Sequence, residues 1–255
     1  MTMNLGRTAA VVRKEIRDYR RSRSILATML VLPVIFLVQP MLSIIRLSSS
    51  VPATTVDRTV SATFLVLLVA PALIPAVLAA SSVVGEREQG TLEPLLITPV
   101  RREELLLGKA VATIVPAVVI AYVLFAVIEV SARLVASNAS VSPGLSSAPH
   151  VVAEVLFAPL LAAWSTWVGI GISVRATDVR VAQQLGSLAS LPPLAVVALV
   201  SFNVFTPSVG LAVAFALALL AGDVILWRIV SAMFDRERLI TGSSARQASR
   251  SSGST

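Results

Sequence analysis

The chain has 255 residues, of which 56% are hydrophobic and 14% are charged, and its mean hydropathy is +0.85. Soluble globular domains carry about 25% charged residues, so this composition excludes an ordinary soluble domain. The 21 Lys and Arg residues outnumber the 14 Asp and Glu residues, which leaves a formal net charge of +7. A chain that is both hydrophobic and basic is typical of a membrane protein facing anionic lipid, and not of a nucleic-acid-binding protein.

The residue inventory also excludes several kinds of active site. With no cysteine and a single histidine, His150, the chain can form neither a disulfide nor a Cys/His zinc site. It contains no H-E-x-x-H and no G-x-S-x-G. The Gly108-Lys109 pair is followed by Ala110 and lacks the upstream glycine loop of a P-loop. We therefore expect no ATPase site, no catalytic residue and no cofactor in this chain.

Ahead of the first apolar segment, the sequence predicts an amphipathic helix. Its apolar residues recur at steps of four, three, four and three, as one helix face requires: Leu5, Ala9, Val12, Ile16 and Tyr19. We expect this helix to lie in the cytoplasmic interface with its arginines near lipid phosphates. A charged flank that only sets topology is the alternative. A cleavable signal peptide is disfavoured, because the apolar segment that follows has 22 residues and contains Pro33 and Pro40.

Charge-free runs locate the membrane spans, because a helix needs about 20 mostly apolar residues to cross roughly 30 Å of hydrocarbon. Four runs of 19 to 27 residues predict one crossing each. A fifth run, residues 181–222, would be about 63 Å long as one helix, so it must fold back. We expect that turn at residues 203–208, which include Pro207. The six expected spans are approximately residues 24–45, 60–84, 110–128, 155–174, 182–202 and 209–231.

The distribution of basic residues predicts the orientation. Eighteen Lys or Arg residues fall in segments on one side of the membrane: seven before the first span, four between spans two and three, two between spans four and five, and five from Arg228 onward. Arg46, Arg58 and Arg133 fall on the other side. The positive-inside rule then places both termini in the cytoplasm of a plasma-membrane protein. We expect a single transmembrane domain over residues 1–240 and a disordered cytoplasmic tail over residues 241–255, and we interpret the Ser-rich external segment 131–149 as a flexible loop.

A few polar and proline residues within or beside the spans are candidates for function. Asp223 lies in the sixth span, and an intramembrane carboxylate is a candidate for contact with a substrate or ion. Its position in the inner third of that span also allows it to reach the cytoplasmic interface. Glu129 and Glu154, at external ends of spans, are expected in water. The pair Pro192 and Pro193 is the best candidate for a hinge.

The most informative segment joins spans two and three and reads GEREQGTLEPLLITPVRREELLLGKA over residues 85–110. Gly90 can leave helical geometry, and Thr91 can cap a short helix after it. The apolar edge of that helix would be Leu92, Leu95 and Leu96. Pro99 suits the first turn of a second helix that leads into span three. An apolar edge beside five glutamates and four basic residues fits a groove on a soluble partner, or alternatively the lipid interface.

This segment resembles the cytoplasmic coupling segment of ABC-2 type permeases, the membrane subunits of ATP-binding-cassette exporters that include drug and sodium extrusion systems. Residues 173–184 and 233–240 are similar to the same family, more weakly. The first external loop is shorter than in the longest members, and no ATPase is fused to the chain. The resemblance covers nearly the whole chain and implies an all-α polytopic membrane protein. Its parts would be six transmembrane helices, an N-terminal interfacial helix and a cytoplasmic coupling helix between spans two and three.

The resemblance also implies a mechanism and partners. The coupling segment would sit in a cleft of a separate nucleotide-binding subunit and transmit its closure to the spans. The residues implied to take part are Gly85, Glu86, Glu88, Gly90, Thr91, Leu92, Leu95 and Pro99. Two ATP-binding subunits, which hold ATP and Mg, and a second permease subunit, identical or a sister, would complete the assembly in membrane lipid. Export of a substrate is implied, and nearly charge-free spans favour an apolar or amphipathic small molecule such as a drug, with sodium as the alternative.

A self-sufficient membrane protein is the alternative from another class. A secondary transporter needs several ionisable residues deep in its spans. The five charge-free runs hold none, and only Asp223 is near one. An intramembrane enzyme needs a paired nucleophile and base or a set of metal ligands, and His150 lies in the external segment. The sequence therefore favours the permease subunit.

Overall fold

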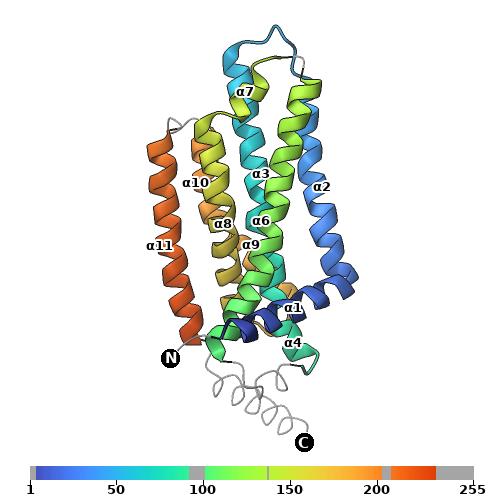
Figure 1. Cartoon of the computed structure of the whole chain (residues 1–255), viewed down its shortest axis with the longest axis vertical. Coiled ribbons are helices and arrows are strands. Elements are labelled where there is room, and N and C mark those ends of the chain that lie inside the picture. Colours follow the sequence, from blue (N-terminus) through green and yellow to red (C-terminus); the bar gives the residue numbers. More distant parts are fainter. Residues whose placement is uncertain (1–3, 92–100, 137, 203–207, 234–255) are drawn as a thin grey trace, which may run out of the picture.

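The computed structural model describes residues 4–91, 101–136, 138–202 and 208–233. All regular structure within these ranges is helical, and six segments are long and apolar enough to cross a membrane. The predicted all-α fold with six spans is therefore confirmed. In Figure 1 the long helices stand side by side, with α1 lying across one end of the bundle and α7 covering the other.

The helices are numbered in chain order. They are α1 Leu5–Arg21, α2 Arg23–Ile45, α3 Ala53–Ser81, α4 Val84–Glu88, α6 Arg102–Val135, α7 Val141–Leu145, α8 Ala148–Arg175, α9 Val179–Ala189, α10 Leu191–Ser201 and α11 Val209–Met233. The spans are α2, α3, α6, α8, the pair α9 and α10, and α11. Helix α6 extends well beyond the charge-free run 110–128, and charged residues of the extension such as Glu104 and Lys109 are buried among partners from other segments.

Helix α3 packs against α8 and α9 through small residues. A Cβ atom added at Gly169 of α8 would lie 2.8 Å from the Cβ of Ala79, and one added at Gly186 of α9 would lie 3.2 Å from the carbonyl oxygen of Ala76. Both alanines are fully buried. Small residues allow membrane helices to approach closely, so these glycines set the spacing of the central helices.

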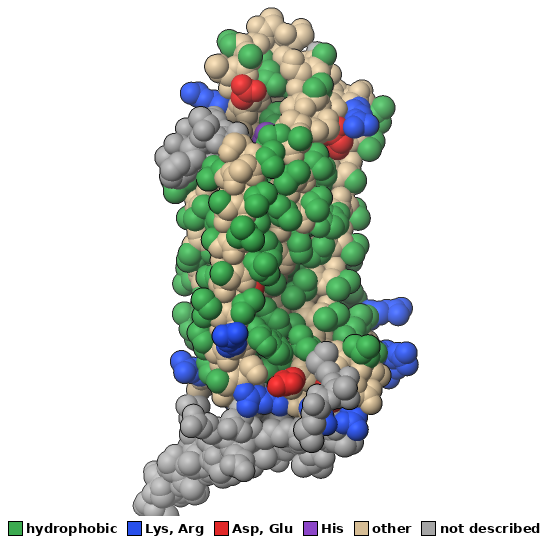
Figure 2. All heavy atoms as spheres, turned by 60° about the vertical axis from the view of Figure 1, so that its left-hand side comes forward, with side chains coloured by type: hydrophobic (Ala, Val, Ile, Leu, Met, Phe, Trp, Pro, Cys, Tyr) green, Lys and Arg blue, Asp and Glu red, His purple; other side chains and the backbone are tan. Residues whose placement is uncertain are grey.

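The surface of the bundle is apolar between two charged ends. Figure 2 shows hydrophobic side chains covering the middle of one face, with Lys and Arg side chains gathered toward the ends. Helix α2 exposes many apolar side chains, among them Leu30, Val34 and Val38, each at least half exposed. An exposed apolar surface of this extent is what lipid or another membrane subunit would cover.

The end of the bundle that carries α7 is more ordered than the sequence indicated. Within residues 131–149 the described part contains α7, whose Val141 and Leu145 are 0% and 1% exposed. A Cβ added at Gly144 would lie 3.0 Å from Val60 of α3. The predicted flexible loop is therefore wrong for the residues described. The two apolar residues four apart form one helix face that packs on α3, and the high serine content of the segment obscured this pattern.

The fifth span is interrupted at Ser190, between α9 and α10. Pro193 lacks the N–H that would donate to the carbonyl of Ala189 in a continuous helix. The indole Nε1 of Trp164 on α8 donates to this carbonyl instead, at 3.1 Å. Pro192 is exposed and Pro193 is buried. The interruption falls where the proline pair was expected to form a hinge, and movement at this point stays a prediction.

Helix α1 differs from the predicted amphipathic pattern in which side it buries. Its start is capped by Asn4, whose side chain accepts a hydrogen bond from the Gly6 N–H. The buried residues are Val11, Glu15 and Tyr19, spaced by four. Leu5 and Ile16 of the predicted stripe are 75% and 40% exposed. The helix therefore has one edge against the bundle and a neighbouring apolar edge that is open, and its place in a membrane interface stays a prediction.

Candidate functional site

Four charged side chains meet at the end of the bundle where α1 lies, and we refer to Lys14, Glu15, Glu86 and Lys109 as the charge cluster. Lys109 Nζ lies 3.0 Å from Glu15 Oε1 and 2.9 Å from Glu86 Oε1. It also donates to the carbonyl of Ser82 at 3.0 Å. Lys14 Nζ contacts the same two carboxylates. The cluster thus joins α1, α4 and α6, which are far apart in the sequence.

Three of the four side chains of the charge cluster are largely shielded from solvent, whereas that of Lys14 is 41% exposed. The side chain of Lys109 is 1% exposed, that of Glu15 is 6% exposed and that of Glu86 is 11% exposed. Removing such charges from water is costly unless opposite charges and hydrogen bonds compensate. Burial raises the pKa of Glu15, but the charges of Lys109 and Lys14 outweigh this and hold the pKa below its ordinary value. The three buried charges of the cluster therefore depend on one another for compensation.

A close approach of two helices positions the cluster. A Cβ atom added at Gly108 of α6 would lie 2.6 Å from Val11 of α1, so only glycine fits at this contact. The next residue, Lys109, is thereby placed beneath α1 and within reach of Glu15. Tyr19, one turn further along α1, has its hydroxyl 3.1 Å from Thr113 Oγ1 on α6. Helix α1 is consequently fixed to α6 by packing, by ion pairs and by this hydrogen bond.

The opposite side of α4 is bound to the segment between α8 and α9. The guanidinium of Arg87 donates to the carbonyls of Ala176 and Val174, both at 3.0 Å. Glu88 Oε1 accepts the N–H of Val179, the first residue of α9, at 3.2 Å. Helix α4 is therefore attached to two parts of the bundle at once.

The start of α4 is also held from α8. The Ser173 hydroxyl oxygen accepts the N–H groups of Val83 and Val84, each at 2.9 Å. The first N–H groups of a helix have no partner within it, so this contact satisfies two of them in a buried place. The sequence expected no such role for Ser173.

Five of the eight predicted coupling residues lie in the described part of the chain. Gly85 is buried, and a Cβ atom added there would lie 3.9 Å from Val179 of α9; the two glutamates make the contacts given above. Gly90 has a φ of +69°, which confirms the predicted departure from helical geometry. The N–H and the hydroxyl of Thr91 both donate to the carbonyl of Glu86, closing the turn. The other three, Leu92, Leu95 and Pro99, lie outside the described residues.

Sequence reasoning missed Glu15 and Lys109 as members of a site. The sequence drew attention to Lys109 only as the residue after Gly108 and as one of the basic residues of segment 85–110. A signal was available for Glu15, since it stands between Val11 and Tyr19 at steps of four, and an acidic residue on an otherwise apolar helix face needs a partner. No local pattern indicated which basic residue that partner would be.

Two carboxylates lie buried within the spans. Asp223 on α11 is 6% exposed and Glu154 on α8 is 1% exposed. None of their four carboxylate oxygens has a hydrogen-bond partner among the described residues. The expectation that Glu154 sits in water is wrong, because α8 begins at Ala148 and carries residue 154 past its first turn onto the buried face with Phe157. Asp223 is likewise buried inside the bundle, and its contact with a substrate or ion stays a prediction.

A cavity of about 330 Å³ lies between α3, α8, α10 and α11, near the end of the bundle at which α8 and α11 begin. Its walls include Phe64, Phe157, Phe215, Val197, His150 and Ser61. Phe157 and Phe215 pack edge to face with ring centres 5.0 Å apart. Asp223 and Glu154 are not among its lining residues. In the part of the chain that the structure describes, no three His, Cys, Asp or Glu side chains are grouped to hold a metal ion.

The six apolar helices and the charged elements at one end of the bundle define a multi-pass helical membrane protein. The sequence also assigns the chain to a family. The family model described as ABC-2 family transporter protein matches residues 9–235, so the chain belongs to this family, as the resemblance implied. It is thus a membrane component of an ABC transporter, a class that works with an ATP-binding subunit. No curated protein matches the chain.

Proposed function

We propose that this chain is the permease subunit of an exporter and that the segment between α3 and α6 receives the closing motion of a separate ATP-binding subunit. The observation that carries the proposal is the double attachment of α4. The charge cluster joins α4 to α1 and α6, and Arg87 and Glu88 join it to the α8–α9 connection. Force applied to the loop that follows α4 would therefore reach several spans at once.

The proposed assembly contains two ATP-binding subunits and a second permease subunit, identical or a sister, in the plasma membrane. Both termini would be cytoplasmic, on the side of α1 and α4, where 18 of the 21 Lys and Arg residues fall by sequence. The exposed apolar surface of α2 supports a further membrane subunit or lipid as its cover.

For the substrate we propose an apolar or amphipathic small molecule. The cavity between α3, α8, α10 and α11 supports this, because aromatic and aliphatic side chains make up most of its walls. Sodium is the second candidate, motivated by the buried Asp223 carboxylate that has no hydrogen-bond partner among the described residues.

The assembly is tested by purifying the tagged chain from its native host in mild detergent. Recovery of a P-loop protein at two copies per two permease subunits is the expected result. Replacing Leu92 and Leu95 by Asp should abolish this recovery while leaving membrane insertion intact. Leu134→Asp is the matched control, since Leu134 is 79% exposed at the far end of α6. Unchanged assembly in the Leu92/Leu95 variant would refute the docking role.

The transmission step needs a separate test. Arg87→Gln removes the two hydrogen bonds to the α8–α9 connection without touching the proposed docking leucines. We expect this variant to retain the ATP-binding subunit but to lose most substrate-stimulated ATPase activity after reconstitution. Equal stimulation in the variant and in the unmodified complex would show that α4 does not transmit the motion.

The substrate class is decided by measuring ATPase stimulation of the reconstituted complex by drugs, lipids and sodium. Ala153 lines the cavity and is 6% exposed, so Ala153→Phe should fill much of the space. We expect this change to abolish stimulation by apolar compounds. Stimulation by sodium that is lost in Asp223→Asn, with no response to apolar compounds, would favour the second candidate.

A further inference from the structure

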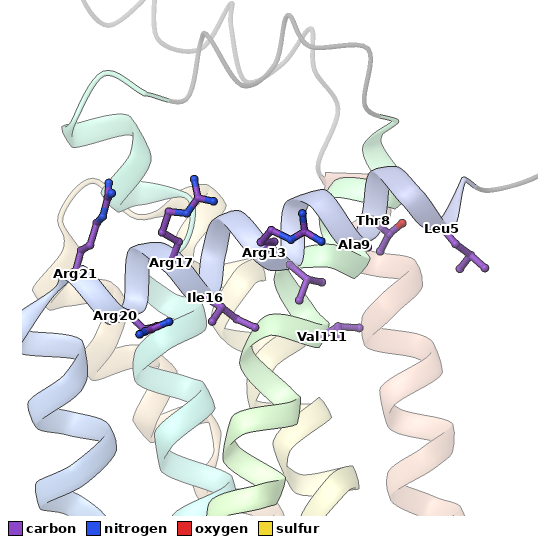
Figure 3. A pocket seen from close by; sticks show the side chains of 10 residues that line it. Leu5, Thr8, Ala9, Arg13, Ile16, Arg17, Arg20, Arg21 and Val111 are labelled. Atoms are coloured by element: carbon purple, nitrogen blue, oxygen red, sulfur yellow. The ribbon is translucent and has the colours of Figure 1, made fainter.

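An open groove runs along α1 where this helix passes over α6, and we refer to it as the α1 groove. Its volume is about 1040 Å³. Leu5, Ile16 and Val111 contribute apolar walls, and Arg13, Arg17, Arg20 and Arg21 contribute positive charge. Figure 3 shows Ile16 and Val111 on the side of α1 that faces the spans, with the Arg17 and Arg21 side chains projecting away from them.

The four arginines of the α1 groove have no acidic partner among the described residues. The acidic side chains nearby are engaged elsewhere. Asp18 pairs with Lys14 at 3.2 Å, and Glu15 belongs to the charge cluster. Glu104 accepts the N–H groups of Asn4 and Arg101, both at 2.9 Å. Four uncompensated positive charges along one short helix favour a ligand that carries negative charge.

An apolar stripe leads away from the groove along α6. Val111, Val115, Val119 and Val123 are spaced by four and therefore share one face of the helix. They are 39%, 53%, 54% and 54% exposed. The stripe spans about 18 Å at about 1.5 Å per residue, which matches the roughly 15 Å depth of one leaflet of a bilayer core. The groove thus combines positive charge at one end with an apolar track of leaflet depth.

We propose that the α1 groove binds an anionic phospholipid of the cytoplasmic leaflet, with its phosphate among the arginines and an acyl chain along the valine stripe. A soluble anion would use the arginines but leave the stripe bare. An acidic protein surface would likewise not extend into the apolar middle of the bundle. Because α1 also carries Lys14 and Glu15, the bound lipid would hold the helix in the position that the charge cluster requires. This proposal does not depend on the direction of transport or on the substrate.

The test uses the full purified chain in nanodiscs of phosphatidylcholine, with fluorescent phosphatidylglycerol as the probe. The double variant Arg17→Gln/Arg20→Gln should bind the probe roughly 25-fold more weakly, about fivefold for each arginine near a lipid phosphate. The matched control Arg46→Gln/Arg58→Gln removes two exposed arginines from the opposite end and should bind as the unmodified chain does. Retention of phosphatidylcholine should not change in either variant.

A second variant separates lipid from other anions and does not alter the arginines. Val115→Ser/Val119→Ser should weaken phosphatidylglycerol binding severalfold without changing the response to glycerophosphoglycerol, which has the headgroup but no chain. Competition by glycerophosphoglycerol or inorganic phosphate at probe-like concentrations would overturn the proposal in favour of a soluble anion. An arginine variant that keeps its lipid preference but loses the ATP-binding subunit would assign the groove to that partner. An equal loss of phosphatidylglycerol binding in the arginine variant and in its control would also overturn the proposal.

Discussion

Lys109 shows how a single buried charge organises the end of the bundle where α1 lies. Its Nζ lies within 3.0 Å of two carboxylate oxygens and a carbonyl oxygen, and these three acceptors come from α1, from α4 and from the end of α3. The ammonium group donates hydrogen bonds to Glu15 Oε1 and to the carbonyl of Ser82, and it forms an ion pair with Glu86. The residue therefore ties three elements to one point, and loss of its charge has consequences for all three.

Replacing Lys109 by Met should leave Glu15 and Glu86 facing each other with only Lys14 for compensation. Breaking a buried ion pair by removing one partner costs about 3–5 kcal/mol. We expect a loss of stability of this order in detergent, measured by thermal or denaturant unfolding. Lys109→Arg is the control, because it keeps the positive charge. This variant should lose less stability than the Met variant. A Met variant as stable as the unmodified chain would contradict the proposed importance of the cluster.

The depressed pKa of Glu15 predicts a dependence of stability on pH. A carboxyl group whose folded pKa lies below its unfolded value, about 4.3, stabilises the folded state above that value. This contribution is lost as the pH falls through the folded pKa. The stability difference between the unmodified chain and Glu15→Gln should therefore be large at pH 7 and shrink below about pH 4. A difference that is constant from pH 7 to pH 3 would show that Glu15 is not held as a charged partner.

At the scale of elements, two junctions depend on close contacts between helices: the contact of α1 with α6, and the break between α9 and α10 within the fifth span. Helix α1 rests on α6 at Gly108, and α9 meets α10 where Trp164 of α8 supplies the donor that Pro193 lacks. The same indole ring lies against Gly222 of α11, where an added Cβ would approach it to 2.7 Å. The position of α1 therefore depends on Gly108 of α6, and the break between α9 and α10 depends on Trp164 of α8.

Gly108→Ala should push α1 away from α6, because the new methyl group would overlap Val11 at 2.6 Å. We expect trypsin to cleave at the arginines of α1 severalfold faster in this variant. Gly210→Ala on α11 is the matched control, since no atom lies within 4 Å of the position of its added methyl group. Identical cleavage rates in the two variants would refute the close contact.

Trp164→Phe should leave the carbonyl of Ala189 without its donor, at a cost of about 1–3 kcal/mol. Pro193→Ala restores a backbone N–H in the position that can donate to this carbonyl. The destabilisation by Trp164→Phe should therefore be smaller in the Pro193→Ala background than in the unmodified chain, as a double-mutant cycle of unfolding would show. Additive effects would mean that the indole does not replace the missing donor.

At the scale of the whole molecule, the bundle has two unlike ends. One carries α1, α4 and the charge cluster, and the other carries α7 and the connection between α2 and α3 (Figure 1). The orientation that the basic residues predict places the first end in the cytoplasm. This orientation decides whether an ATP-binding subunit can reach the proposed coupling segment after α4.

Because the sequence contains no cysteine, this orientation can be tested with introduced thiols, without labelling of native thiols in the chain. Ser50→Cys and Gln89→Cys place single thiols at exposed positions of the two ends. In intact cells a membrane-impermeant maleimide should label the Ser50 variant and not the Gln89 variant. Permeabilised cells should give labelling of both. The reverse pattern in intact cells would invert the proposed topology.

Much of the fold followed from local sequence. Six spans were predictable because a charge-free run of about 20 residues is enough to fill the hydrocarbon layer, whatever its neighbours are. The turn geometry at Gly90 was predictable for a similar reason, since glycine tolerates a positive φ that other residues rarely adopt. The burial of Glu154 and the packing of α7 were not predictable from local sequence, because each depends on which helix face meets α3 and its neighbours.

The sequence by itself determined the class of protein, the number of spans and the segment in which coupling is proposed, because hydrophobic length and residue order are local properties. Only the tertiary structure decided that Glu15, Glu86 and Lys109 form one cluster and that Trp164 completes the break beside Pro193. These partners lie between 23 and 94 residues apart in the sequence. Pairing over such separations depends on how the helices pack and rotate against one another, which no local period specifies.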